Sequence, residues 1–218
     1  MEESRRNNNR LVLLMIAGIP LTMILMASWL WYFVVRGDLD LVGVLGTANR
    51  GTLVQPPRQL DDFELSEQTG VPIKYADLER RWTMLVPQAA GACDQACEQR
   101  LDLTRQIHVA MGKEFGRLRR LFMSEDAVAD NGLAVAELSD GRPAPPGFAR
   151  LLADEHRGLK ALRLETGAYA NLFAEHMADP STWYLVDPAG WIMRSYDSEV
   201  SYKDVISDLK FLLKNSSE

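Results

Sequence analysis

The sequence lacks the features that mark several common classes of protein. Its 218 residues contain only two cysteines and three histidines, with no internal repeats and no low-complexity tracts. The chain also has no excess of basic residues, and its formal net charge of -6 gives no reason to expect binding to nucleic acid. Two cysteines permit one disulfide, one dithiol redox pair or one metal site with two thiolate ligands.

Charge is absent from one long stretch near the N-terminus. Leu11–Val35 runs for 25 residues without a charged side chain, which is long enough to span roughly 30 Å of hydrocarbon. Trp29, Trp31 and Tyr32 lie near its far end, as in an interfacial aromatic belt. The alternative is a cleaved signal peptide, but the apolar run is long for one and no convincing small-x-small site follows it. We therefore expect an uncleaved transmembrane helix.

The charges that flank this stretch predict its orientation. Three arginines precede it, and the residues that follow include two aspartates and one arginine. The positive-inside bias then places a tail at residues 1–10 in the cytoplasm and residues 61–218 on the other side, after a linker at 36–60. The sequence thus predicts a bacterial protein held in inner membrane lipid, with a periplasmic domain. Because that compartment is oxidising, a bare cysteine pair would rest there as a disulfide unless it is reduced.

Strand-like and helix-like stretches alternate through the expected domain. The linker at 36–60 is rich in glycine and proline, with one short strand expected around Leu41–Leu45. Apolar patterning then predicts strands at Phe63–Leu65, Val71–Tyr75, Trp82–Val86, Arg117–Met123, Leu159–Leu164, Thr182–Val186 and Trp191–Ser195. Helices are expected at Asp94–Met111, at Ala149–Gly158 and after a capping serine at Ser201, while Ser124–Phe148 is loop-like. This alternation predicts an α/β fold with a mixed sheet flanked by helices.

Both cysteines lie where a predicted strand leads into the longest predicted helix. Cys93 and Cys97 follow Trp82–Val86, a proline and a run of small residues. Unpaired N–H groups and the helix dipole favour an anion at this point, so a thiolate forms more readily. A spacing of four residues places the two side chains on one helix face, within reach of a disulfide. The pair could cycle between dithiol and disulfide, clamp a soft ion such as Cu(I), or form a static bridge.

The order of these signals resembles the Sco/SenC proteins, thioredoxin-like factors that handle copper in cytochrome c oxidase assembly. The matching stretches are the N-terminal anchor, DDFEL at 61–65, a strand that begins with Trp82, CDQAC at 93–97, YLVDPAG at 184–190 and SDLKFLL at 207–213. The sequence departs from the family pattern in two places. Asp179 stands where the family has its metal-binding histidine, with His176 the closest histidine, and no proline lies between the two cysteines.

The resemblance implies a thioredoxin-like domain with Cys93 as an exposed attacking thiol and Cys97 as the resolving thiol or second ligand. His176 would complete a Cu(I) site with both cysteines, or it is a surface histidine, with Met177 as a softer alternative donor. The implied function is to deliver Cu(I), or to exchange thiols and disulfides with the copper-ligand cysteines of an oxidase subunit or another assembly factor. A general thiol–disulfide oxidoreductase without metal is a further possibility. A docking module with a vestigial cysteine pair is an alternative that is not an enzyme.

The other two histidines have simpler interpretations. His156 lies between Glu155 and Arg157, which indicates a solvated helix surface. His108 falls on the apolar stripe of the cysteine helix, which indicates a core histidine with its hydrogen bonds satisfied. The arginine-rich run RLRR at 117–120 is interpreted as an alternating strand at a sheet edge.

Overall fold

The computed structural model describes residues 15–29, 31–32 and 50–216 of the chain. Residues 15–29 and 31–32 are helical. Within the described ranges, no helix combines the length and the apolar character needed to cross a membrane. The expected span at 11–35 lies partly outside these ranges, and the expected strand at Leu41–Leu45 lies wholly outside them.

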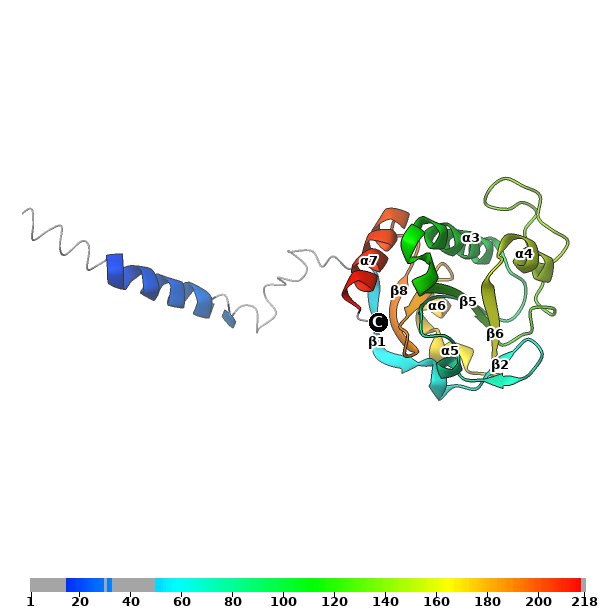
Figure 1. Cartoon of the computed structure of the whole chain (residues 1–218), viewed down its shortest axis with the longest axis horizontal. Coiled ribbons are helices and arrows are strands. Elements are labelled where there is room, and N and C mark those ends of the chain that lie inside the picture. Colours follow the sequence, from blue (N-terminus) through cyan, green and yellow to red (C-terminus); the bar gives the residue numbers. More distant parts are fainter. Residues whose placement is uncertain (1–14, 30, 33–49, 217–218) are drawn as a thin grey trace, which may run out of the picture. The chain divides into compact units, whose positions relative to one another are not determined.

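One eight-stranded mixed sheet organises the C-terminal unit, Ala48–Glu218 (Figure 1). Its strand order is β1-β8-β7-β4-β5-β6-β2-β3. The three central strands β4, β5 and β6 are parallel, and all other pairs are antiparallel. The strands are β1 Thr52–Gln59, β2 Leu65–Glu67, β3 Pro72–Ile73, β4 Trp82–Gln88, β5 Leu118–Ser124, β6 Leu159–Leu164, β7 Trp183–Val186 and β8 Trp191–Tyr196. The prediction of a mixed α/β sheet is confirmed.

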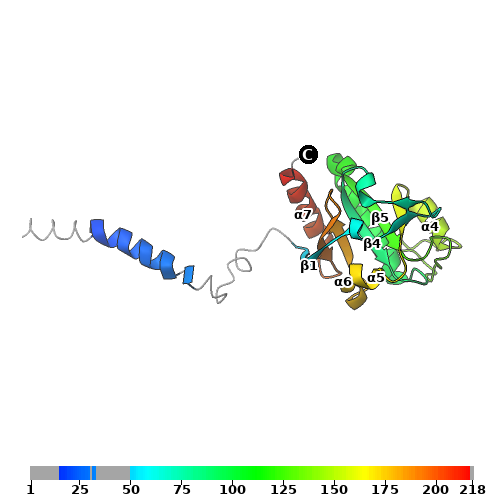
Figure 2. The ribbon, with the colours of Figure 1, turned by 90° about the horizontal axis from the view of Figure 1, so that it is seen from below.

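Helices cover both faces of this sheet (Figures 1 and 2). The helices are α3 Gln95–Ala110, α4 Phe148–Glu155, α5 Tyr169–Leu172, α6 Ala174–Ala178 and α7 Tyr202–Asn215. Alternate residues of β4 point to opposite faces, as a strand requires. Met84 packs with α3 and α7 in one cluster, and Leu85 packs with α5 in another. The centre of the sheet is therefore buried on both sides.

The N-terminal edge of the domain differs from the expected linker. Residues 52–59 form β1, which pairs with β8 at one edge of the sheet. The register shifts between Leu53 and Arg58, around Pro56 and Pro57. Proline has no N–H to donate, so a strand tolerates it only at a sheet edge or a bulge. This segment is an edge strand, and its register shift lies at the two prolines. Glycine and proline content alone made the segment resemble a linker.

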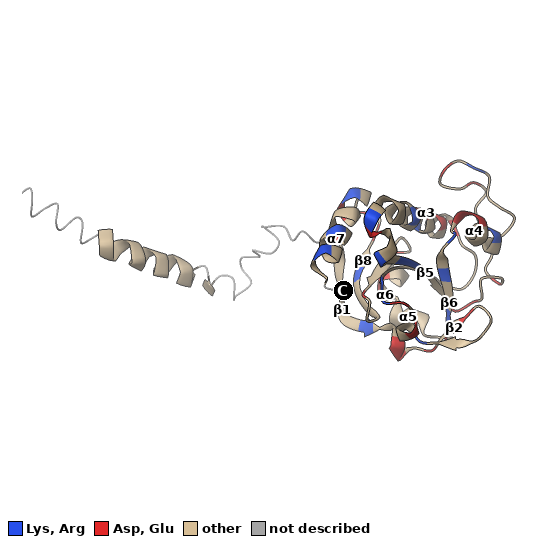
Figure 3. Cartoon of the chain, viewed as in Figure 1, with Lys and Arg blue, Asp and Glu red and all other residues tan. Residues whose placement is uncertain are grey.

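Basic and acidic residues are interspersed over the domain (Figure 3). The arginine-rich run was expected at a sheet edge, and this prediction is wrong. It contributes to β5, which lies between β4 and β6, and Arg120 within it is buried. Arg120 is accommodated because it donates hydrogen bonds to the Leu101 carbonyl at 2.7 Å and to the Thr104 hydroxyl.

Candidate functional site

The two cysteines meet at the start of α3. The chain leaves β4 at Gln88, passes through a short loop and enters the helix with Asp94 as the N-cap. The Asp94 side chain accepts a hydrogen bond from the Cys97 amide at 2.9 Å, which satisfies one of the unpaired donors of the first turn. Cys93 and Cys97 form a disulfide with their Cα atoms 5.2 Å apart. The sequence spacing allows a dithiol, a metal-bound pair or a disulfide, and the structure shows the disulfide.

Both sulfurs are buried, and neither cysteine is exposed to solvent. The segment 125–147, which connects β5 to α4 and is called the cover segment here, lies against them. The Cys93 amide donates to the Gly132 carbonyl at 2.9 Å, and the Ala134 amide donates to the Cys93 carbonyl at 2.8 Å. The expectation of an exposed Cys93 is therefore not met in this disulfide form. The reason is that a long-range backbone bridge brings the cover segment over the pair.

A buried carboxylate on α3 fastens a second part of the cover segment. Glu98 follows Cys97 directly and is only 3 % exposed. It accepts hydrogen bonds from the Ser139 amide at 3.1 Å and from the Ser139 hydroxyl. Leu138, the residue before this serine, packs in the same apolar cluster as the cysteines. The cover segment is thus attached to the loop before α3 at Cys93 and to α3 itself at Glu98.

His176 lies in α6 with both ring nitrogens engaged. Its Nδ1 is 2.7 Å from the Tyr169 hydroxyl, and its Nε2 contacts the Arg100 guanidinium. Arginine can only donate, so Nε2 must be the acceptor and Nδ1 must carry the proton in the neutral ring. Burial, followed by the positive charge of Arg100, lowers the pKa of His176 to about 4. The imidazole is therefore neutral at physiological pH, but its lone pair is directed at Arg100.

Arg100 links the histidine to the cysteine loop. It is 3 % exposed and lies on α3, one turn beyond Cys97. Its guanidinium also donates to the Pro180 carbonyl and, at 3.2 Å, to the side-chain oxygen of Gln88. Gln88 in turn donates to the Ala92 carbonyl, directly before Cys93. Burial lowers the pKa of Arg100 to about 10, so it remains a cation near the pair at neutral pH.

The role of Arg100 in holding His176 was not predicted. The sequence shows that it is three residues from Cys97 and can favour a thiolate there. It does not show the contact with a histidine 76 residues away. The available signal was the position of Arg100 beside Leu101 on the buried side of the cysteine helix.

These contacts bear on whether the proposed ligands could hold copper. Ligation by His176 needs a free lone pair and contact near 2 Å. In this structure that lone pair accepts from Arg100, and the two sulfurs are bonded to each other. Across the described residues, no three histidine, cysteine or acidic side chains gather closely enough to hold a metal ion. In this disulfide form, the structure brings Cys93 and Cys97 together while His176 is held by Arg100. Copper binding by these three residues in the reduced protein stays a prediction.

His176→Gln should therefore leave the Cu(I) affinity of the reduced full-length chain unchanged within about threefold, which is less than 1 kcal/mol. Glutamine keeps an acceptor for Arg100, so the network is preserved. The measurement is competition with a Cu(I) chelator, with Cys93→Ser/Cys97→Ser as the control that removes both soft donors. A loss of about tenfold or more in the histidine variant would show that the ring swings to the metal.

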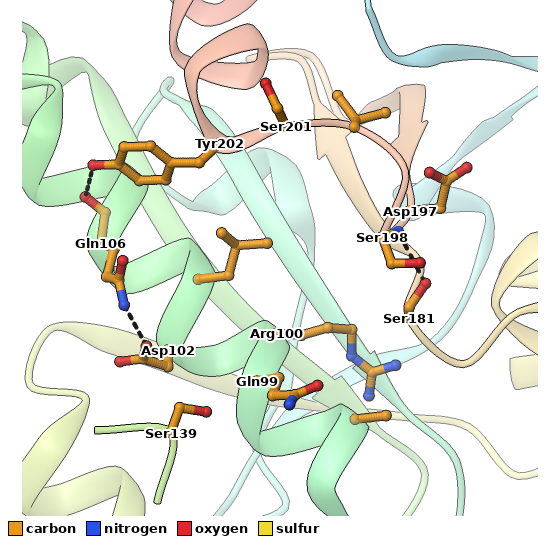
Figure 4. A pocket seen from close by; sticks show the side chains of 13 residues that line it. Gln99, Arg100, Asp102, Gln106, Ser139, Ser181, Asp197, Ser198, Ser201 and Tyr202 are labelled. Atoms are coloured by element: carbon orange, nitrogen blue, oxygen red, sulfur yellow. Dashed lines mark hydrogen bonds between the residues drawn. The ribbon is translucent and has the colours of Figure 1, made fainter. Parts of the chain in front are cut away.

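A groove of about 530 Å³ is lined by residues of α3, of the loop before α7 and of the start of α7 (Figure 4). Its lining includes Ala96, which lies between the two cysteines in the sequence, and Tyr202 at the start of α7. Figure 4 shows the Tyr202 hydroxyl bonded to the Gln106 carbonyl, at a distance of 3.3 Å. Arg100 also lines this groove. The surface next to the cysteines is therefore hollowed, although the sulfurs themselves are covered.

The other two histidines serve the structure. His156 was expected to be solvated, and this prediction is wrong, because it is 3 % exposed and lies 3.3 Å from Arg120 through Nδ1. Burial, with Arg120 as the next cause, lowers the pKa of His156 to about 3. His108 is partly buried and stacks on Phe115, and its Nε2 lies 3.0 Å from the Phe115 carbonyl. The expected hydrogen-bond partner of His108 is confirmed, but its expected place in the core is wrong, because the residue is only half-buried.

Comparison with solved structures shows the same fold. Yeast Sco1 with copper bound is 19% identical, with a TM-score of 0.51 over 71% of this chain and 92% of the yeast chain. Arabidopsis thaliana ScoI with copper bound is 13% identical, with a TM-score of 0.51 over 71% of this chain and 97% of the plant chain. The resemblance to Sco proteins that the sequence motifs indicate is confirmed in the fold. No curated protein sequence matches this chain.

A family model supplies the classification. The model of the transmembrane-like, thioredoxin-like C-terminal domain matches residues 82–142 and 134–216. These two matches extend from the start of β4 to the end of α7 and include the cysteine pair, the cover segment and His176. Together they cover more than half of the 218 residues. The chain therefore belongs to the family of transmembrane-like, thioredoxin-like C-terminal domains.

Proposed function

We propose that this protein is a membrane-tethered thioredoxin-like factor of cytochrome c oxidase assembly that acts by thiol–disulfide exchange. The observation that supports this proposal most is the Cys93–Cys97 disulfide at the N-terminus of α3. It lies in a domain whose fold resembles that of copper-bound yeast Sco1. The likeness in fold supports a role in oxidase assembly. The disulfide supports thiol–disulfide exchange as the reaction.

In the proposed reaction, the reduced chain keeps the copper-ligand cysteines of an oxidase subunit reduced. The Cys93 thiolate attacks a disulfide in the subunit, which releases one subunit thiol and forms a mixed disulfide. The Cys97 thiolate then attacks the Cys93 sulfur, which releases the second subunit thiol and forms the bond seen here. Two electrons and two protons pass from this protein to the subunit. A dithiol reductant restores the reduced chain and is itself oxidised to a disulfide.

Arg100 and the groove support exchange with a protein partner. A nearby buried cation favours the thiolate form of the pair, and the Asp94 carboxylate opposes it. The groove beside Ala96 provides a hollow surface against which a partner chain can lie. Cu(I) as cargo receives less support, because His176 is held by Arg100 and Tyr169.

The proposed tether is the apolar span at 11–35, with the N-terminus in the cytoplasm and the domain in the periplasm. The uncharged run Leu11–Val35 and the arginines before it support this topology. A tether confines the domain to the plane of the membrane and raises its effective concentration towards a partner in the same membrane.

A docking module is the second candidate, and a specific observation favours it. Both cysteines are bonded and fully buried. In this alternative the fold offers a binding surface, and the disulfide only stabilises the start of α3. The two candidates differ in whether the sulfurs ever exchange.

The test of the proposed function is the reduction of an oxidase copper-site domain whose two ligand cysteines have been oxidised. Pre-reduced full-length protein should reduce this domain stoichiometrically, and Cys93→Ser/Cys97→Ser should abolish the reaction. His176→Gln is the matched control and should react like the wild type, because His176 belongs to neither step. If the cysteine variant also supports oxidase assembly in cells as well as the wild type does, the docking module is correct and exchange is excluded.

A further inference from the structure

The cover segment determines whether any partner can reach the disulfide. Thiol–disulfide exchange requires an attacking sulfur to approach a sulfur of the bond in line. Both sulfurs lie in one apolar cluster, beneath residues of the cover segment that include Leu133 and Leu138. In the closed form the bond is therefore protected from any macromolecular thiol.

The contact between the cover segment and the cysteine loop is tight. A Cβ atom at Gly132 would lie 3.1 Å from the Cβ of Ala92, so the two backbones meet with almost no space between them. The two hydrogen bonds of Cys93 with Gly132 and Ala134 lie next to this contact. A small displacement of the cysteine loop must therefore either push the cover segment or break those bonds.

Within the cover segment, one buried polar atom has no hydrogen-bond partner among the described residues. Asn131 is 5 % exposed, and its side-chain nitrogen donates to the Ala127 carbonyl at 2.9 Å. Its side-chain oxygen is buried and has no hydrogen-bond partner among the described residues. A buried acceptor without a partner is unfavourable, and exposure to water would satisfy it. Opening at this residue therefore recovers part of the free energy that the broken contacts lose.

The oxidation state of the pair changes what the cover segment must enclose. A disulfide is neutral and compact, and it fits among Val86, Leu101 and Phe122. After reduction the two sulfurs must separate to van der Waals distance, and a well-packed core tolerates such expansion poorly. The helix N-terminus and Arg100 favour a thiolate at the start of α3, but burial of that thiolate within the apolar cluster still costs solvation free energy. Both effects favour an open cover segment in the reduced protein.

We propose that the cover segment is a redox-controlled gate that is closed over the Cys93–Cys97 disulfide and opens when the pair is reduced. The inference rests on the proposed function for its purpose, since an open gate would expose Cys93 only when it can donate electrons. The oxidised protein would then be closed to further partners. Reduction by a small dithiol breaks the S–S bond, forms two thiols in the protein and leaves the reductant as a disulfide.

Three amides report directly on the gate: those of Cys93, Ala134 and Ser139, which are bonded to Gly132, Cys93 and Glu98 respectively. Their hydrogen exchange can be measured in the intact chain in mild detergent, with the pair oxidised and with it reduced by dithiothreitol. We expect exchange at Ala134 and Ser139 to accelerate about tenfold or more on reduction, because local opening breaks their hydrogen bonds.

Amides in the central strands and three variants serve as controls for the gate. The amides of Leu85 and Leu121 lie in the paired central strands, and they should keep their protection in both states. Cys93→Ser/Cys97→Ser cannot form the bond, so it should exchange rapidly at Ala134 with or without reductant. Ser139→Ala should open more readily while still oxidised, because it loses one hydrogen bond to Glu98, whereas Ser198→Ala, outside the cover segment, should not.

Equal protection in the oxidised and reduced proteins would overturn the gate. A uniform loss of protection that includes Leu85 and Leu121 would also overturn it, because the disulfide would then stabilise the whole domain. The hydrogen-exchange measurements involve no oxidase partner. A gate that opens in a protein that fails to reduce the oxidised copper-site domain would therefore refute only the proposed function.

Discussion

Asp208→Ala is expected to lower the free energy of unfolding by about 3–5 kcal/mol, because it leaves a buried arginine without its partner. Asp208 lies on α7 and is fully buried. Its carboxylate accepts two hydrogen bonds from Arg194 of β8, at 3.1 and 2.8 Å, and one from the Tyr196 hydroxyl at 2.7 Å. The ring of Tyr196 stacks on Trp183 at 4.6 Å, so the same substitution loosens the core between α7 and the sheet.

Urea unfolding of the full-length chain, followed by tryptophan fluorescence, provides the measurement. The matched control is Asp154→Ala, which removes a carboxylate from the exposed Arg150–Asp154 pair on α4. Exposed pairs of this kind contribute about 0–1 kcal/mol, so the control should unfold nearly like the wild type. Similar losses in the two variants would show that Arg194 finds another partner or reaches water.

Acid is expected to destabilise the domain well above the range in which carboxylates titrate. The pKa is about 4 for His176 and about 3 for His156, both below the ordinary value of 6.5. As the pH falls from about 6.5 towards 5, the unfolded chain therefore approaches two more bound protons than the folded chain at these two histidines. The stabilisation is complete above pH 6.5 and is lost as the pH falls towards the folded pKa values, by about 1.4 kcal/mol per pH unit for each histidine.

The measurement is the free energy of unfolding in urea at pH 8, 7, 6 and 5. The wild-type stability should be nearly constant from pH 8 to 7 and should then fall steeply. His156→Gln/His176→Gln should flatten the slope between pH 6.5 and 5, because glutamine does not titrate and can still accept from the neighbouring arginines. A double variant with the wild-type slope would refute the assignment of the pH dependence to these two histidines.

The sequence predicted the elements whose signals are local. A proline, a run of small residues and helical periodicity place Cys93 and Cys97 at the start of a helix, and α3 begins at Gln95. Ser201 caps α7 as expected, since its hydroxyl accepts from the Asp204 amide at 3.2 Å. Caps and periodicity depend on residues three or four apart, so a sequence pattern contains them.

The features that were missed depend on contacts between distant segments. The cover segment has no periodicity, and its bond from Cys93 to Gly132 joins residues 39 positions apart. His156 lies between two charged residues, yet it is buried, and its Nδ1 contacts Arg120 from β5. Local polarity predicts exposure only when no other element packs over the residue. The pair itself was therefore predictable, and its protection from solvent was not.

The pairing of β1 with β8 determines the order in which the domain can be completed. β1 is the first strand of the domain to be synthesised, but its partner Ser195 lies 143 residues after Thr52. Until β8 has been made, the first strand and its buried Val54 have no edge on which to add. Pairing over such a separation is slow, because the entropy cost of closing a large loop comes before the pairing contacts stabilise the strand. A nascent chain thus keeps β1 unpaired until β8 has been made, and a chain that ends before Trp191 lacks the strand on which β1 adds.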